Sequence, residues 1–108
     1  VAAIIRFIAQ CYGISIADFI SHRRTARLVG PRHIAMWLAK EMTTKSLPFI
    51  GQRFGGRDHT TIFHGIRKIE CLRKTDFSLQ NQLDQFQRAL RSNPMENSNA
   101  DIPNDSGF

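Results

Sequence analysis

Apolar residues recur every three or four positions along most of the chain, which is the spacing of amphipathic helices and not of strands. The first two predicted helices have inward-facing apolar residues at Ile4, Ile5 and Ile8 and at Ile16, Phe19 and Ile20. Gly13 is placed to end the first helix, and Ser15 is placed to cap the second.

A basic stretch over residues 21–27 shows no apolar period, which predicts an exposed loop. Pro31 is then expected to open a third helix, because proline fits the first helical turn. The apolar stripe of this helix consists of Ile34, Trp37, Leu38 and Met42.

A short fourth helix, a glycine turn and a longer fifth helix are predicted next. Ser46 is a typical N-cap, and Pro48 suits the first turn. The short helix stops near Phe54, and Gly55 and Gly56 supply a tight reversal, since glycine tolerates positive φ. A short helix, a tight turn and a longer helix are typical of the helix-turn-helix motif.

The fifth helix is predicted from about residue 58 to residue 74, with two distinct faces. Its apolar face contains Ile62, Ile66, Ile69 and Leu72, and its polar face contains Thr60, His64, Arg67 and Lys68. A sixth helix follows a cap at Thr75 or Asp76, with its apolar stripe at Leu79, Leu83, Phe86 and Leu90. These predictions place one domain over residues 1–92. Residues 93–108 are rich in Asn, Pro, Ser and Asp, which predicts a disordered polar tail.

The charge is unevenly placed along the 108 residues. All 15 Lys and Arg lie between Arg6 and Arg91, together with 6 of the 9 acidic residues, so this body carries a net charge of +9 and the tail −3. A basic body with a pI near 10.2 indicates a polyanionic partner, with nucleic acid the first candidate. Charge alone is equally compatible with a basic protein that has no specific partner.

Cysteine and histidine spacing argues against a metal site. Cys11 and Cys71 stand alone, without the paired spacing of zinc ligands. We interpret both as buried structural thiols in a reducing cytosol. The first apolar run is broken by Arg6 and is too short to span a membrane. We therefore expect a cytoplasmic protein with no cofactor, no membrane association and no small-molecule substrate.

Polar residues are concentrated in the first turn of the fifth helix, where a DNA-reading helix presents them to base edges. Asp58 can cap this helix through the N–H of Thr60 or Thr61, or it can accept from a cytosine amino group. Thr60 can contact a thymine methyl group or a base edge. Arg57 and Thr61 are placed for phosphates near the helix N-terminus. No Ser, Cys or carboxylate is placed to form a nucleophile–base pair, so we expect no enzyme.

Residues 54–61, followed by His64 and residues 67–69, resemble the signature of the DnaA family of bacterial replication initiators, specifically its C-terminal DNA-binding domain. The resemblance extends over residues 4–90 and includes residues 23–25, 31–36, 39–41 and 46–48.

The resemblance implies an all-α, six-helix helix-turn-helix domain of the Trp-repressor-like type that binds double-stranded DNA. It implies that Arg24, flanked by Arg23 and Thr25, lies in the minor groove. It also implies that Asp58, His59 and Thr60 read the major groove. Residues matching positions on the backbone-facing side are Arg32, His33, Lys40, Lys45, Leu47, Pro48, Arg57 and Thr61, and Arg27 and Pro31 are also expected to bind DNA.

Several residues depart from the family pattern. Gly30 stands where arginine is usual, and Arg27 could compensate from a shifted position. His33 replaces a usual glutamine, Phe49 a usual glutamate, and Gly65 a usual alanine inside the recognition helix. None of these departures falls within residues 57–61, which predicts intact base reading with weaker affinity.

The resemblance leaves several functions open. The chain shows no ATPase motif, so it is either a piece of an initiator whose ATPase domain lies upstream or a small stand-alone paralogue, and the acidic tail favours the paralogue. A transcriptional or phage-type regulator with the same DNA-binding domain is an alternative. So is a protein-interaction module in which exposed Phe49 and Phe63 dock a partner helix.

Overall fold

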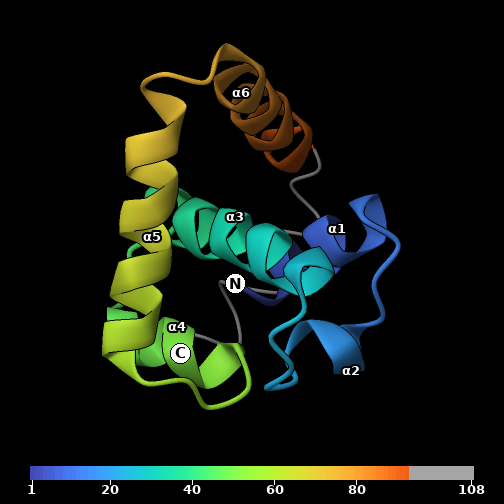
Figure 1. Ribbon diagram of the computed structural model, residues 1–108, viewed down its shortest axis with the longest axis vertical. Helices are drawn as coiled ribbons and strands as arrows, with labels where there is room; N and C mark the ends of the chain where they lie inside the picture. Colours follow the sequence, from blue (N-terminus) through green and yellow to red (C-terminus); the bar gives the residue numbers. More distant parts are fainter. Residues whose placement is uncertain (93–108) are drawn as a thin grey trace.

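The longest helix, α3 (Ala26–Met42), lies at the centre of the molecule, and the other helices pack around it (Figure 1). The computed structural model describes residues 1–92. The surrounding helices are α1 (Ala2–Cys11), α2 (Ile16–Phe19), α4 (Leu47–Arg53), α5 (His59–Arg73) and α6 (Phe77–Arg91). The described residues contain no strand, so the prediction of an all-α fold with six helices is confirmed.

The central helix is buried around most of its circumference. Six consecutive residues from Ile34 to Ala39 are buried, beyond the stripe of one face that the apolar period predicted. A helix in contact with neighbours on several sides needs apolar residues all round. The alanines at 35 and 39 let those neighbours approach closely.

Side-chain caps begin three of the helices as predicted. The Oγ atoms of Ser15 and Ser46 accept from the N–H of Asp18 and Phe49 at 3.1 and 3.2 Å. Asp76 accepts from the N–H of Leu79 at 3.0 Å and begins α6. These bonds satisfy N–H groups that have no partner within the helix.

The start of α3 was predicted wrongly. The helix begins at Ala26, with Thr25 at the N-cap, so Pro31 lies inside it as its sixth residue. The proline nitrogen cannot donate to the carbonyl of Arg27, which weakens the ladder there without ending the helix. Arg27 therefore belongs to the first turn of α3 and not to the preceding loop.

Several burial predictions also need correction. Ile16 and Leu72 are exposed, although both were assigned to apolar faces. Both cysteines are exposed free thiols instead of buried ones. Phe49 is half-buried, with the cations of Lys45 and Arg53 5.3 and 4.9 Å from its ring centre, so it is not an exposed docking residue. The predicted tail lies outside the described residues.

Candidate nucleic-acid interface

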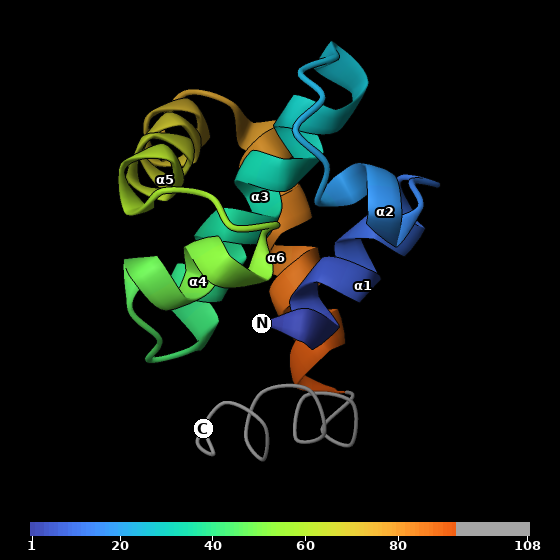
Figure 2. The same cartoon turned by 90° about the horizontal axis from the view of Figure 1, so that it is seen from below.

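A groove separates the loop before α3 from the N-terminal half of α5. Figure 2 looks along α5 from its N-terminal end and shows the loop and the helix on either side of α3. The groove has a volume of about 750 Å³. Its lining residues are His22, Arg23, Arg24, Val29, Arg32, His33, Met36, Gly56, Arg57, Asp58, Thr61, His64, Gly65 and Lys68.

The groove is strongly basic. Its lining contains five Arg or Lys residues and one carboxylate, that of Asp58. A concave surface lined by one sign of charge concentrates ions of the opposite sign. The groove is therefore suited to a polyanion.

The turn between α4 and α5 is held close to the loop by glycines. Gly55 and Gly56 have φ values of +82° and +77°, as their turn predicted. A Cβ on Gly55 would lie 2.2 Å from the carbonyl oxygen of Ile20, and one on Gly51 would lie 2.1 Å from that of Arg57. Gly51 was not singled out by the sequence, because its requirement comes from a neighbouring backbone.

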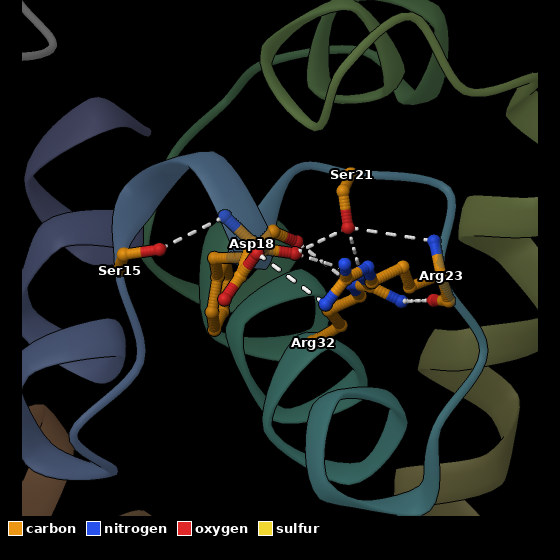
Figure 3. A network of polar contacts seen from close by, with 6 residues as sticks. Ser15, Asp18, Ser21, Arg23 and Arg32 are labelled. Atoms are coloured by element: carbon orange, nitrogen blue, oxygen red, sulfur yellow. Dashed lines mark hydrogen bonds and ion pairs between the residues drawn. The ribbon is translucent and has the colours of Figure 1, made fainter.

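Arg32 organises the loop from below. Its side chain is 3% exposed, and its Nε donates to the carbonyl of Phe19 at 2.7 Å. Its remaining donors reach the carbonyls of Asp18 and Arg23 and the hydroxyl of Ser21, as Figure 3 shows. The guanidinium of Arg32 is therefore buried and bonded to protein acceptors, and its contact with a phosphate stays a prediction.

Arg57 holds the same loop from the side of the helix-turn-helix. Its guanidinium donates to the carbonyls of Ile20 and Ser21 and to that of Phe54 at the end of α4. It is half-buried and lines the groove, and its contact with a phosphate stays a prediction. Burial lowers the pKa of both Arg32 and Arg57, and a neighbouring guanidinium lowers each further. Both remain charged at neutral pH, because the pKa of arginine starts so high.

The first turn of α5 presents its polar side chains outward. Asp58 occupies the N-cap position, but its carboxylate accepts no bond from the first-turn N–H groups of α5, all of which lie in the described part of the chain. The capping interpretation is therefore wrong. The carboxylate lies 3.2 Å from Nδ1 of His59, and both side chains are more than 60% exposed. Thr60 and Thr61 are exposed as well.

The groove brings together only part of the predicted site. Predicted residues that line it are Arg23, Arg24, Arg32, His33, Arg57, Asp58 and Thr61. Predicted residues outside its lining are Thr25, Arg27, Pro31, Lys40, Lys45, Leu47, Pro48, His59 and Thr60. Of these, Pro31 is buried, whereas Arg27 and Lys40 are exposed on α3. Lining residues that were not predicted include His22, His64 and Lys68, and the polar face of α5 was the available signal for the last two.

The fold and the groove together define an all-α helix-turn-helix domain. Residues 1–69 match the bacterial DnaA protein helix-turn-helix family, and the chain belongs to this family.

Similar proteins include two bacterial initiators. The chain is 53% identical over 83 residues to the chromosomal replication initiator protein DnaA of Caulobacter vibrioides (strain NA1000 / CB15N), which is 77% of this chain and 17% of that protein. It is 51% identical over 86 residues to the same initiator of Rhodopseudomonas palustris (strain HaA2), which is 80% of this chain and 18% of that protein. The chain thus spans less than a fifth of these relatives.

The helices formed by residues 1–92 include none with the length and apolar character needed to cross a membrane.

Proposed function

We propose that this domain binds double-stranded DNA at DnaA-box-like sites, in replication initiation or its regulation. The observation that carries the proposal is the basic groove, which has an ordered loop on one side and the exposed first turn of a recognition helix on the other. The similarity to chromosomal replication initiators supports the same function. The domain acts by binding alone, in the cytoplasm, without a catalytic step.

The recognition helix α5 enters the major groove with its first turn. Asp58, His59 and Thr60 are exposed there and carry the acceptors, donors and methyl group that distinguish base pairs. Arg24 on the loop enters the adjacent minor groove, where narrow A·T-rich sequence deepens the negative potential. Residues that then face the DNA backbone are Arg23, Thr25, Arg27, His33, Lys40, Lys45, Leu47, Pro48 and Thr61.

Arg32 and Arg57 serve this site without reading DNA. They fix the loop against the helix-turn-helix, so that Arg24 and Thr60 are offered to neighbouring grooves at a set separation. A loop ordered before binding loses less conformational entropy when the complex forms.

The test is fluorescence anisotropy of the chain titrated onto a duplex carrying a DnaA box and onto a shuffled duplex, at two salt concentrations. We expect a strong preference for the box, with binding to the shuffled duplex lost first as salt rises. Equal, salt-sensitive binding to both duplexes would contradict box recognition and favour a regulator with different sites. Selection of bound sequences from a random pool would then identify those sites.

Thr60→Ala sharpens this test at one side chain. Loss of one base contact should weaken binding to the box by about 1–3 kcal/mol and leave binding to shuffled DNA nearly unchanged. Thr75→Ala, an exposed threonine beyond the far end of α5, is the matched control. Equal losses on the two duplexes would remove Thr60 from the base-reading set.

A further inference from the structure

The recognition helix packs against α3 at a glycine. Gly65 is buried in the middle of α5, where it faces Met36 and His33 of α3. A Cβ on Gly65 would lie 2.6 Å from Sδ of Met36 and 2.9 Å from Cδ2 of His33. Both distances are far shorter than the usual separation of nonbonded carbon atoms, near 3.5–4.0 Å. A side chain at position 65 would therefore require the Met36 side chain and the His33 ring to move.

The two partners differ in their freedom to yield. Met36 also lines the groove but is only 2% exposed, so most of its side chain packs against buried residues that its displacement would disturb. His33 is half-buried and lines the groove. A side chain at position 65 would thus push the imidazole out of the contact and into the space that DNA is proposed to fill.

The imidazole lies in a positively charged environment that favours its neutral form. Burial, then Lys68 of α5 and Arg32 of α3, lower the pKa of His33. Other titratable groups along the groove are His22, Arg23, Arg24, Arg57, Asp58 and His64. Movement of the ring toward solvent would remove part of the burial effect and raise its pKa.

We propose that His33 and Gly65 form a coupled pair of positioning residues that sets the distance of α5 from α3. Because the missing Cβ leaves room for the imidazole, the pair determines where the first turn of α5 stands relative to Arg24 on the loop. The part of this proposal that concerns DNA rests on the proposed function, whereas the packing part does not.

A double-mutant cycle tests the coupling with the wild type, Gly65→Ala, His33→Gln and the double variant. Replacing a helical glycine by alanine normally stabilises a helix. We expect the opposite for Gly65→Ala alone, a fall of several degrees in melting temperature and at least a tenfold loss of affinity for the box duplex. In the His33→Gln background, the flexible glutamine can move away and leave room for Cβ of residue 65 and for a shift of Met36. Gly65→Ala in that background should therefore keep or raise the melting temperature and cost little affinity for the box duplex.

Gly30→Ala is the matched control. Gly30 lies within the first half of α3, and apart from its chain neighbours and the nearby backbone of its own helix, no atom of the described residues lies within 4 Å of the position that its Cβ would take. This substitution should raise the melting temperature by about 4–8 °C for each kcal/mol gained in helix propensity.

Nuclear magnetic resonance titration of the His33 ring adds a second readout, because Gly65→Ala should raise the pKa of His33.

Additive effects of the two substitutions on melting temperature would overturn the coupling. Thermal coupling with an unchanged box affinity in Gly65→Ala would overturn the positioning role. If Gly65→Ala does not fold, a folded double variant supports the pair and an unfolded one contradicts it. If the wild type shows no preference for the box, the proposed function fails, but the melting temperatures still decide the packing proposal.

Discussion

At the scale of single residues, two arginines of one groove have opposite surroundings. Arg24 is exposed on the loop, whereas Arg32 is buried beneath it and bonded to main-chain carbonyls. A sequence pattern of basic residues counts both toward nucleic-acid binding. In the structure, the exposed charge of Arg24 is available to a ligand, whereas the buried charge of Arg32 stabilises the fold of the loop.

Arg24→Ala should weaken binding to box DNA and flatten its dependence on salt. The guanidinium is proposed to lie in the minor groove, where its charge displaces counterions from the DNA. Since the side chain is exposed, the free energy of unfolding should hardly change. Anisotropy titrations over a range of salt concentrations measure the slope, and an unchanged slope would place the loop away from the DNA.

Arg32→Met should lower the free energy of unfolding by about 1–3 kcal/mol, because the carbonyls of Asp18 and Phe19 at the end of α2 and that of Arg23 in the loop lose their donor. Methionine keeps an apolar stem of similar length, so lost polar bonds dominate the effect. Urea denaturation measures the change, with Arg27→Met, an exposed residue of the same helix, as control. Equal stability of the two variants would refute the organising role of Arg32.

The N-cap positions of α4 and α5 should respond differently to alanine. Ser46→Ala removes a cap bond and should cost about 0.5–2 kcal/mol of stability. Asp58→Ala removes no such bond and should cost much less stability, but it should reduce box affinity. Thermal melts and anisotropy of both variants check this pair, and a large loss of stability in Asp58→Ala would restore the capping interpretation.

At the scale of helices, local chemistry was the predictable part. Caps at Ser15, Ser46 and Asp76 depend on side chains within three residues of the N–H they serve, so sequence alone located them. The start of α3 was missed because Thr25 occupies the N-cap without a side-chain bond. The proline five residues into the helix was the stronger local signal.

Exposure was less predictable than helix position. Leu72 follows the apolar period of α5 but lies near the end of that helix and stays exposed. The apolar period predicts on which face of a helix a residue lies. Burial also requires that a neighbouring helix extends far enough to cover that residue. The thiols of Cys11 and Cys71 were misjudged for another reason, since free cysteine is usually buried, whereas both are exposed here.

Contact between α3 and α5 should also make stability depend on pH. Nε1 of Trp37 donates to the carboxylate of Glu70 at 2.9 Å, and the guanidinium of Arg73 donates to the same carboxylate at 3.1 Å. These bonds, that of Trp37 first, lower the pKa of Glu70 below its usual 4.5. A carboxylate with a lowered folded-state pKa stabilises the fold above its unfolded value, and this contribution is lost as pH falls through the folded value.

Glu70→Gln should therefore flatten the dependence of melting temperature on pH in the acid range just below 4.5. As pH falls across that range, the melting temperature of the wild type should approach that of the variant. Glu41→Gln, at an exposed position near the end of α3, controls for the loss of one carboxylate. Parallel curves for the wild type and Glu70→Gln would contradict the prediction.

At the scale of the whole molecule, the site depends on contacts that no local pattern reports. Arg57 bonds to Ile20 and Ser21, which precede it by 37 and 36 residues. The acceptors are carbonyl oxygens, which every residue carries, so the partner sequence gives no signal. The motif residues were predictable from their resemblance to a family, but the bonds that place them together were not.

The departures at His33 and Gly65 were separate observations in the sequence. They lie 32 positions apart and do not share a motif, so nothing along the chain joins them. They meet at the contact between α3 and α5, and the proposed coupling would give both a common physical cause.

The attachment of the loop to the domain has a consequence for how such sites can diverge. Arg32 and Arg57 hold the loop through the main-chain carbonyls of Arg23 and Ser21, and these bonds do not depend on the exposed side chains of His22 and Arg24. If the loop contacts DNA as proposed, substitution at those positions would alter which nucleotides are preferred while the path of the backbone is preserved. The residues that would contact DNA could then change during evolution without changing those that hold the loop. A descendant of this chain could therefore acquire a new target sequence through single substitutions.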